Sequence, residues 1–265
     1  GTCRIAPYSG ASLAWQGPEA DLNDTINTQP ALFVHSVAAW KVLKQDFPAL
    51  QPVFVAGHSM GQLSALVASG ALPFADGLRL ARRRGELMKQ AGETNPGGMA
   101  AVLGAEISLL EQICAQASTA EEIVQVANDN CPGQVVISGA KPALERAMAL
   151  ATQAGIRRIR PLAVSIAAHS PLMAPAEADF NQAIASIPLV DPLIPLVGNV
   201  SARPLTTVTG LAEDLNAQLT SRVRWTETIR FITAQGVQNF IELGNGNVLA
   251  GLIKRIDDQA NVISL

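Results

Sequence analysis

The sequence predicts a mixed α/β fold in which a smaller domain is inserted into a larger one. Short apolar segments typical of strands alternate with segments of helical period along the 265 residues. The breaker run ETNPGG at residues 93–98 is followed by segments in a β-α-β-β-α-β order. With 48% hydrophobic and 15% charged residues, the chain can bury a substantial core. We therefore expect a large domain at residues 1–97 and 164–265 and a ferredoxin-like small domain at residues 98–163.

The first part of the large domain is predicted to be helical around one short strand. The run TQPALFVHSVAAWKVL begins with the capping residue Thr28, has a proline in its first turn and is apolar around its circumference, which predicts a buried helix. PVFVAGHSMG predicts an apolar strand that runs into a turn bracketed by Gly57 and Gly61, and GQLSALVASG predicts a helix that ends at Gly70. PFADGLRLARRRGELMKQAG predicts an amphipathic helix that ends near Gly92.

The inserted domain and the rest of the chain have equally regular patterns. From Met99 the pattern predicts the strand MAAVLG, a helix over about residues 106–118, the strand EIVQVAN, a turn at CPG, the strand QVVISG, the helix KPALERAMALATQAG and the strand IRRIRPL. In the remainder, PLIPLVGNV and GVQNFIELG predict buried strands, and AEDLNAQLTS and GNVLAGLIKRI predict helices. The large domain is thus expected to resume after the insertion.

Composition and charge argue against several classes of protein. The net charge is −3 and no dense block of Lys and Arg is present, so we expect no nucleic-acid partner. Three cysteines, Cys3, Cys114 and Cys131, are too few and too widely spaced for a disulfide framework or a paired-thiolate metal site, which favours a reducing cytoplasm and no metal. No apolar stretch reaches the roughly 18 residues of a membrane span, and the first residues lack the pattern of a secretory signal.

A serine nucleophile is predicted at Ser59. GHSMG at residues 57–61 is a G-x-S-x-G sequence that stands after an apolar strand and before a helix, where a nucleophile elbow requires it. The glycines permit the tight turn that exposes the serine, and the free N–H groups of the helix start can stabilise an oxyanion. A capping serine in a glycine-rich turn is the simpler alternative, but the strand and helix on either side favour catalysis.

A base for this serine can be sought by elimination, because the chain has three histidines. His35 lies in the predicted buried helix and is expected to be a core histidine, while His58 adjoins the serine and should point away from it. His169, in the loop-like VSIAAHSPLM, remains as the predicted general base, against the alternative of a buried structural histidine. The acidic residues between serine and histidine, such as Glu106 and Glu145, fall in the inserted domain, so we expect a backbone carbonyl to orient His169.

An arginine is predicted to point into the core near the elbow. Leu80, Ala81, Leu87 and Met88 mark the apolar face of their helix, and Arg84 falls in the middle of that face. A buried guanidinium must meet an anion, which is either a protein carboxylate or the carboxylate of a ligand. Beside the elbow, Arg84 would be able to clamp a dicarboxylic acyl group through two hydrogen bonds. An internal ion pair or a side chain that reaches back to solvent is the alternative.

Seven ordered motifs carry a resemblance to a known family: TQPALFVHSVA, AGHSMGQLSALVASGAL, FADGLRLARRRGELM, NDNCPGQVVISG, VSIAAHSPLM, QLTSRVRW and IELGNGNVLAGLIKRI. The chain resembles the malonyl-CoA:acyl carrier protein transacylases of fatty-acid synthesis and the acyltransferase domains of polyketide synthases. The resemblance implies an α/β-hydrolase-like large domain and transfer of a malonyl group from malonyl-CoA to the phosphopantetheine thiol of an acyl carrier protein. It implies no cofactor beyond these partners, and we expect a cytoplasmic monomer.

The resemblance also implies roles for individual residues. Ser59 would be the acylated nucleophile, His169 its base and Arg84 the malonyl clamp, the same three residues that the elbow, the elimination and the helical pattern indicate. Two further catalytic roles come from the resemblance alone: the main-chain carbonyl of Gln218 would orient the histidine, and the amide of Met60 would donate to the oxyanion.

Six other positions are predicted to contact substrate or carrier. His58 and Asn130, which lie in two of the motifs, are assigned to substrate binding. An acidic carrier surface is expected in this family, and basic residues near predicted element ends are candidates to dock it, with solvated surface charge as the alternative. These residues are Arg157, Arg158, Lys254 and Arg255.

The sequence departs from the family pattern at four places. No strand with a G-Q-G-S-Q-like turn, which would supply a second oxyanion donor, precedes TQPALF, so we expect an N-terminal family segment to be lacking or the oxyanion hole to be impaired. The usual glutamate three residues after the serine is Gln62, and the usual Gly-Pro-Gly is Gly-Asn-Gly at residues 244–246; both should be tolerated. Residues 166–169 (IAAH) match neither common extender signature, so overall resemblance alone favours malonyl over methylmalonyl.

Three alternative functions stay open at this point. A serine esterase or thioesterase would release free malonate rapidly without a carrier. A non-catalytic subunit that docks carriers would form no acyl-serine. A malonyl transferase subunit of a malonate decarboxylase complex would share the chemistry but not the pathway, and the sequence leaves fatty-acid and polyketide synthesis undivided.

Overall fold

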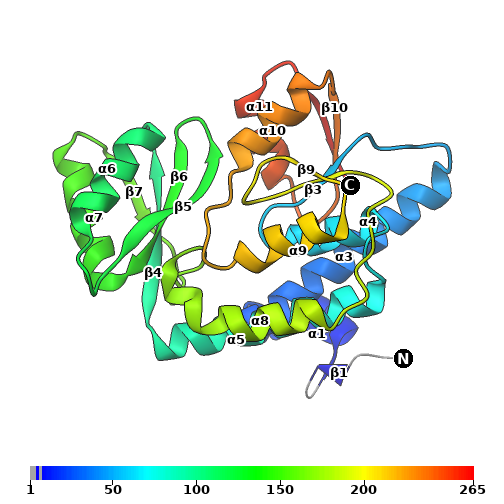
Figure 1. The fold of residues 1–265 in the computed structure, drawn as a ribbon, viewed down its shortest axis with the longest axis horizontal. Helices are drawn as coiled ribbons and strands as arrows, with labels where there is room; N and C mark the ends of the chain where they lie inside the picture. The colour runs from blue at the N-terminus through cyan, green and yellow to red at the C-terminus, as the bar shows by residue number, and fades with distance from the viewer. Residues whose placement is uncertain (1–3, 6–7) are drawn as a thin grey trace.

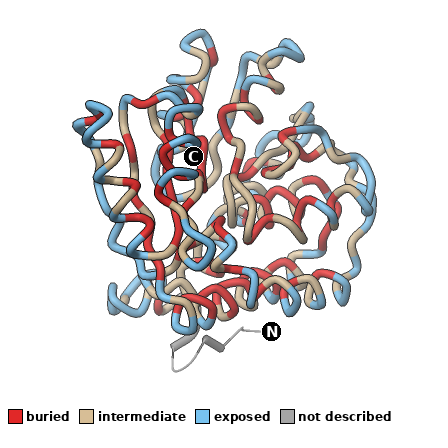
Figure 2. The backbone as a smooth tube through the Cα atoms, turned by 60° about the vertical axis from the view of Figure 1, so that its left-hand side comes forward, coloured by how far each residue is buried: buried red, intermediate tan, exposed pale blue. Residues whose placement is uncertain are grey.

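The computed structural model describes residues 4–5 and 8–265, with side chains from residue 12 onward. It has the mixed α/β composition that the sequence predicts, arranged as two lobes (Figure 1). The small lobe, residues 97–161 at the left of Figure 1, contains one four-stranded sheet and two helices. The large lobe contains the rest, and buried residues lie on the inner sides of its helices (Figure 2).

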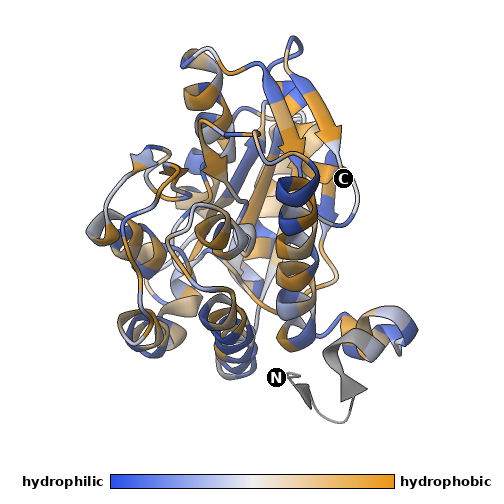
Figure 3. Cartoon of the chain, turned by 90° about the vertical axis from the view of Figure 1, so that its right-hand side faces the viewer, coloured by the Kyte–Doolittle hydropathy of each residue, from blue (hydrophilic) through white to orange (hydrophobic). Residues whose placement is uncertain are grey.

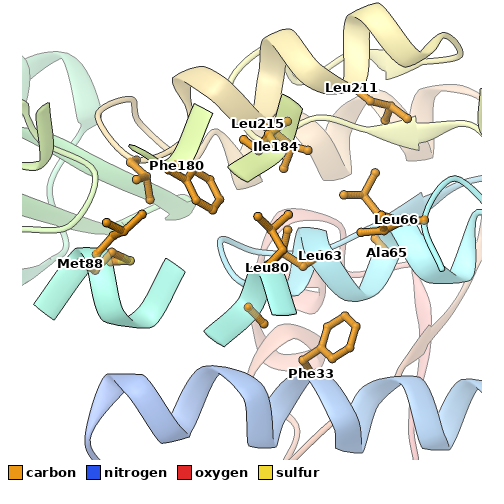
Figure 4. Close-up of a cluster of buried hydrophobic side chains, with 14 of the residues drawn as sticks. Phe33, Leu63, Ala65, Leu66, Leu80, Met88, Phe180, Ile184, Leu211 and Leu215 are labelled. Atoms are coloured by element: carbon orange, nitrogen blue, oxygen red, sulfur yellow. The ribbon is translucent and has the colours of Figure 1, made fainter. Parts of the chain in front are cut away.

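Five helices surround the main core of the large lobe. They are α3 (Thr25–Asp46), α4 (Gly61–Ala68), α5 (Phe74–Thr94), α8 (Ala174–Ala185) and α9 (Val208–Ala217). Apolar side chains that are at most 2% exposed fill the space between them (Figure 4): Phe33, Leu63, Leu66, Leu80, Phe180, Leu211 and Leu215. Because α4 follows the predicted elbow and α5 carries the predicted buried arginine, this packing fixes the position of both.

Helix α3 begins at Thr25 and not at the predicted cap. Asp24 is the N-cap, and its Oδ1 accepts a hydrogen bond from the backbone N of Ile26 at 3.1 Å. The hydroxyl of Thr28 instead donates to the backbone carbonyls of Leu22 and Asp24. The capping prediction for Thr28 is therefore wrong, because the carboxylate of Asp24 reaches the free N–H groups one turn earlier.

The prediction that α3 is buried around its whole circumference is also wrong. Its buried residues, including Phe33 and Val37, form one stripe that packs against α4 and α5. Val34 is 41% exposed, and His35 is exposed. An apolar sequence does not show which faces the neighbouring elements cover, so His35 is a surface histidine and not the core histidine that we expected.

The remaining helices of the large lobe have ten residues or fewer. They are α1 (Gly10–Gln16), α2 (Glu19–Leu22), the 3₁₀ turn η1 (Pro171–Met173), α10 (Trp225–Ala234) and α11 (Val248–Ile256). Within the described residues, none of the helices combines the length and hydrophobicity needed to cross a bilayer.

The strands of the large lobe form short separate sheets. β3 (Val55–Ala56) is parallel to β8 (Leu196–Val197), which is antiparallel to β9 (Pro204–Leu205). β10 (Asn239–Glu242) is parallel to β11 (Asn261–Ser264), and β1 (Arg4–Ile5) pairs with β2 (Tyr8–Ser9).

β10 and β11 are less buried than the pattern predicted. Figure 3 shows apolar residues along the strands beside the C-terminus, yet Ile241 is 39% and Ile263 is 60% exposed. Only one side of this pair, with Phe240 and Val262, packs on the apolar cluster of α10 and α11. The prediction of a buried strand holds for β8 and is wrong for β10, because one face of the β10–β11 pair packs on this cluster and the side chains of the other face, such as Ile241, stay exposed.

The small lobe has the predicted order of elements. The strands are β4 (Gly97–Leu103), β5 (Val124–Cys131), β6 (Gln134–Ala140) and β7 (Arg158–Pro161), and the helices are α6 (Ile107–Ala117) and α7 (Lys141–Gln153). The strands lie in the order β5-β6-β4-β7, all antiparallel to their neighbours. Both helices pack on one face of this sheet through a core of its own, which includes Val102, Leu110 and Ile137.

The two lobes are joined by backbone hydrogen bonds at strand β5. The segment 218–224 of the large lobe runs beside it, with Asp129 N donating to Val223 O at 2.9 Å and Val223 N donating to Ala127 O at 2.8 Å. Arg222 of the same segment forms an ion pair with Glu111 of α6 at 2.6 Å. The small lobe therefore fixes the path of a segment that leads into the predicted catalytic region.

Phe33 provides a test of the packing between α3 and α5. Its ring is fully buried and stacks on Phe74 with 5.6 Å between ring centroids. We expect Phe33→Ala to lower the free energy of unfolding by about 3–5 kcal/mol. Val34→Ala, one residue along the same helix but 41% exposed, should lower it by less than about 1 kcal/mol. Urea unfolding of both variants measures the difference, and equal losses would contradict the burial of one stripe of α3.

Candidate active site

Ser59 occupies the turn between β3 and α4 with a left-handed backbone. Its φ is 52°, a region that few residues other than glycine adopt. A Cβ added to Gly57 would lie 2.0 Å from the backbone O of Gly61, so the turn closes only because position 57 has no side chain. Gly61 has open space where a Cβ would stand, and the tight turn does not depend on it for steric reasons. A turn of this geometry between a strand and a helix is the conformation that a nucleophile elbow requires.

The side chain of Asn199 holds this turn together. Its Oδ1 accepts a hydrogen bond from Ser59 N at 2.7 Å, and its Nδ2 donates to Gly57 O at 2.7 Å. Asn199 is 1% exposed and lies two residues after the end of the apolar strand β8, which pairs with β3. Asn199 was not predicted as a site residue, although a polar side chain just beyond the end of a buried parallel strand is a signal for one.

His169 lies against the serine hydroxyl. Its Nε2 is 2.8 Å from Ser59 Oγ, and its Nδ1 is 2.9 Å from Gln218 O and 3.2 Å from Ser221 O. Carbonyl oxygens only accept hydrogen bonds, so Nδ1 carries the proton and Nε2 is free to accept one from the serine. Backbone carbonyls thus orient this imidazole, and the arrangement can remove a proton from Ser59.

The environment of His169 keeps the imidazole neutral. The side chain is 3% exposed, and burial together with the positive charge of Arg84 lowers its pKa to about 3. A neutral histidine can act as a base without first losing a proton to solvent. Burial also lowers the pKa of His58.

Arg84 is buried beside the nucleophile, as the helical pattern predicted. It is 2% exposed, and its Nη2 donates to Ser59 Oγ at 3.0 Å. Its other hydrogen bonds go to the side-chain oxygens of Gln218, at 2.9 and 3.2 Å, and of Gln29, at 2.8 Å. All of these partners are neutral, and no carboxylate pairs with Arg84 anywhere in the described part of the chain.

Among the residues that the structure describes, this guanidinium has no counter-ion. Burial lowers the pKa of Arg84 to about 10, which leaves the group positive at neutral pH. The alternatives of an internal ion pair and of a side chain that reaches back to solvent are therefore not what the described residues show. A buried cation of this kind is stabilised when a ligand carboxylate binds it.

Helices α3 and α5 approach closely enough for Gln29 to reach Arg84. A Cβ on Gly85 would lie 2.7 Å from the backbone O of Thr25, so glycine is needed at this crossing. Gln29 itself is 6% exposed and was not predicted as a site residue. Its signal was its helical position, four residues before Phe33 and so on the same face of α3, where a buried polar side chain must find a polar partner.

His58 points away from the serine and toward the small lobe. Its Nε2 lies 2.8 Å from Oδ1 of Asn130 on β5, and its ring meets the ring of Trp225 edge-on at 5.6 Å. Asn130 is 9% exposed. The two residues that we assigned to substrate binding are thus in contact with each other, directly beside the nucleophile turn.

Met60 lies at the start of α4 with a free backbone amide. The amides of the next residues are used by the turn and helix, with Gly61 N donating to His58 O and Gln62 N to Ser59 O. The Met60 amide has no hydrogen-bond partner among the residues that the structure describes. Together with the dipole of α4, it can bind an oxyanion that forms next to Ser59.

The four basic positions are all exposed, and two of them flank the same pair of turns. Arg158 Nη2 is 3.7 Å from where a Cβ of Gly104 would stand, and Arg255 Nη2 donates to Pro132 O at 3.1 Å. Gly104 N donates to Gly133 O at 2.8 Å, which brings these turns together. Arg158 and Arg255 therefore border one surface, with Arg157 and Lys254 adjacent to them in sequence.

The described residues hold no group of three or more His, Cys, Asp or Glu that could bind a metal ion. Cys114 and Cys131 are buried free thiols, and burial raises the pKa of Cys114 to about 12. Cys3, which entered the prediction of a reducing compartment, lies outside the described residues.

The low pKa of His169 predicts the pH dependence of proton abstraction from Ser59. Because the imidazole stays neutral above about pH 4, kcat/KM for acylation should be level from about pH 8 to pH 5. A free histidine would instead cause a fall with a midpoint near 6.5. The measurement is kcat/KM across this range, with re-assay at pH 7 after each exposure to exclude acid inactivation. A tenfold fall between pH 6.5 and 5.5 that reverses on re-assay would contradict the assigned environment.

Comparison with known proteins gives consistent matches. The pattern that defines the family described as acyl transferase domain matches residues 8–263. The malonyl CoA-acyl carrier protein transacylase of Haemophilus influenzae is 44% identical over 253 residues, which are 96% of this chain and 81% of that protein.

Solved structures match equally well. The malonyl-CoA:acyl carrier protein transacylase of Xanthomonas oryzae superposes with a TM-score of 0.93 at 41% identity, covering 97% of this chain and 81% of that one. A malonyl-transacylase solved in complex with its type II polyketide acyl-carrier protein gives 0.93 at 40% identity, covering 97% and 83%.

Proposed function

The chain belongs to the acyl transferase domain family, and on this premise we propose that it moves a malonyl group from malonyl-CoA to an acyl carrier protein through an ester on Ser59. The resemblance that the sequence motifs carried is confirmed by relatives at about 40% identity over nearly the whole chain. The observation that carries the substrate assignment is the buried guanidinium of Arg84, which bonds Ser59 Oγ and is neutralised by no carboxylate in the described part of the chain.

In the first half-reaction, His169 Nε2 takes the proton of Ser59 as Oγ attacks the thioester carbon of malonyl-CoA. The carbonyl oxygen becomes an oxyanion that accepts from the amide of Met60 at the start of α4. Collapse of this intermediate breaks the C–S bond, and the protonated His169 returns its proton to the coenzyme A thiolate. The carbonyls of Gln218 and Ser221 stabilise the imidazolium that exists between these events.

The second half-reaction runs the same steps in reverse. The phosphopantetheine thiol of the carrier gives its proton to His169 Nε2 and attacks the ester carbon. The C–O bond to Ser59 breaks, and His169 returns the proton to Ser59 Oγ. Every bond made or broken is supplied by the two substrates and the serine, so the reaction requires no metal or redox cofactor.

Arg84 accounts for the preference for a dicarboxylic acyl group. It donates to Ser59 Oγ and to two neutral amides, and its planar fork can turn two of these donors to the free carboxylate of the malonyl ester. A neutral acyl chain would leave the charge unpaired. His58 and Asn130 border the same turn and are proposed to contact the substrate.

The proposed domain organisation is a hydrolase-like large domain, residues 1–97 and 164–265, with a ferredoxin-like insertion at 98–163. Support comes from the strand-turn-helix unit around Ser59 and from the strand order β5-β6-β4-β7 with two helices on one face. We further propose that the protein acts as a monomer in the cytoplasm.

The substrate assignment predicts a selective effect of Arg84. Arg84→Ala should lower kcat/KM for malonyl-CoA by about 10²-fold or more, the equivalent of about 3 kcal/mol, because the carboxylate loses its partner. Acetyl-CoA, which has no carboxylate, should react as well as before or better. Arg84→Lys should recover little, since a point charge does not reproduce the planar fork.

Arg83→Ala is the matched control, because Arg83 is its neighbour on α5 with a side chain 43% exposed. It should leave kcat/KM for malonyl-CoA and for acetyl-CoA unchanged. Equal losses for malonyl-CoA and acetyl-CoA in a folded Arg84→Ala protein would make Arg84 structural and remove the main support for a malonyl substrate.

A carrier-docking surface is proposed around Arg157, Arg158, Lys254 and Arg255. Arg158→Glu combined with Arg255→Glu should weaken transfer to the carrier about tenfold or more at low salt and leave acylation by malonyl-CoA unchanged. Stopped-flow measurement of each half-reaction separates the two effects. The control is Arg79→Ala, an exposed arginine on α5. If both half-reactions fall together, this surface does not bind the carrier selectively.

A further inference from the structure

A buried carboxyl group on α9 lies behind the nucleophile turn, and no step of the mechanism uses it. Asp214 is 5% exposed. Its Oδ1 accepts from Gln62 Nε2 and from Asn199 N, both at 2.9 Å, and its Oδ2 accepts from Ser201 N at 3.0 Å and Ser201 Oγ at 2.9 Å. Val200 N adds longer contacts to both oxygens. No basic side chain pairs with it in the described residues, so hydrogen bonds alone offset its burial.

The surrounding backbone is shaped for this group. A Cβ on Gly198 would lie 2.2 Å from Oδ2 of Asp214, so the loop after β8 leaves space for the carboxyl only because position 198 is glycine. Every partner of Asp214 is a donor, and the group therefore acts purely as an acceptor here. Neighbouring groups must therefore turn a donor toward Asp214, which fixes their orientation.

One arm of hydrogen bonds leads from Asp214 to the serine. Asp214 holds the backbone of Asn199, whose side chain bonds Ser59 N and Gly57 O on either side of His58. The backbone of Ser59 has a positive φ of 52°, a conformation that persists only when its surroundings enforce it. The side chain of Asn199 holds Ser59 in this conformation through its two hydrogen bonds to the turn, and Asp214 holds Asn199 through its backbone N.

A second arm leads from Asp214 to the arginine. Because Asp214 only accepts, Gln62 must present its NH₂ group to it and its Oε1 to Gln218 Nε2. Gln218 then has to present Oε1 to Arg84, where it accepts from Nε and Nη2. The direction of both amides, and with it the placement of the guanidinium, follows from the carboxyl group at position 214.

We propose that Asp214 is a positioning residue that orients the nucleophile through Asn199 and the acyl-binding arginine through Gln62 and Gln218. The proposal rests on the malonyl transfer proposed above, and it assigns a role to Gln62, which replaces the usual glutamate. A glutamine suits this site because its NH₂ group meets a carboxyl, whereas two carboxyl groups at 2.9 Å would repel each other.

The two arms predict separable effects on kcat/KM for malonyl-CoA and acetyl-CoA. Asn199→Ala should lower kcat/KM for malonyl-CoA and for acetyl-CoA by about the same factor, on the order of 10²-fold, because the serine is misplaced. Gln62→Leu should lower kcat/KM for malonyl-CoA about tenfold and kcat/KM for acetyl-CoA by a clearly smaller factor, because this arm acts mainly on the arginine and reaches the serine backbone through one contact, from Gln218 Nε2 to Ser59 O at 3.2 Å. Asp214→Asn should show both effects: a lower kcat/KM for each substrate, and a smaller ratio of kcat/KM for malonyl-CoA to kcat/KM for acetyl-CoA.

The experiment compares these three variants with the wild type and with Glu213→Gln, an exposed neighbour of Asp214 on α9 that should be silent. Rates are divided by the folded fraction from circular dichroism. A purely structural role for Asp214 would reduce the folded fraction and leave the rate per folded protein and the ratio of the two substrates unchanged, which would overturn the proposal. A wild type without preference for malonyl-CoA would instead contradict the proposed function, and the two failures are thereby distinguishable.

Discussion

The guanidinium of Arg84 is sealed from solvent and bound only by neutral oxygens, one of which belongs to the nucleophile. Removing an unpaired charge from water costs several kcal/mol, and three hydrogen-bond partners offset only part of this. The rest of the large lobe keeps the group in place through the helix core around α5 and the close approach of α3 at Gly85. A carboxylate that enters beside Ser59 therefore finds a preformed partner and stabilises the protein on binding.

Segments from distant parts of the chain must meet for the site to exist. The serine comes from the turn between β3 and α4, the arginine from α5, the histidine from the loop after the small lobe, and its orienting carbonyls from residues 218–221. Strand β5 of the small lobe pairs with Val223, two residues after these carbonyls, and Gln125 of β5 donates to both His169 O and Thr220 O. The small lobe thus contributes directly to the geometry of the base.

Site residues and elements could be predicted from the sequence where a single local pattern determines them. The elbow pattern, the elimination among three histidines and the helical position of Arg84 led to Ser59, His169 and Arg84. In the structure His169 Nε2 lies 2.8 Å and Arg84 Nη2 lies 3.0 Å from Ser59 Oγ. The small lobe was predictable because period and order are local properties. The same rules were insufficient for α3, where the apolar circumference did not reveal that His35 faces outward.

The residues that sequence reasoning missed act through tertiary contacts. Asn199, Asp214 and Gln29 are polar residues whose role depends on what lies opposite them, and a single sequence does not specify the partner. Gln62 was expected only to be tolerated, whereas the structure gives it a defined partner. Similarly, β10 followed a strand pattern, but the exposure of its side chains depends on which faces of the β10–β11 pair other elements cover.

The central claim is that Ser59 accepts a malonyl group that Arg84 holds and that water does not readily remove. Intact-protein mass spectrometry after mixing with malonyl-CoA tests it most directly. The account predicts one malonyl adduct, mapped to Ser59 by peptide analysis, that persists without a carrier and disappears when carrier with a free phosphopantetheine thiol is added. Absence of an adduct, an adduct at another residue, or rapid release of free malonate without the carrier would contradict it.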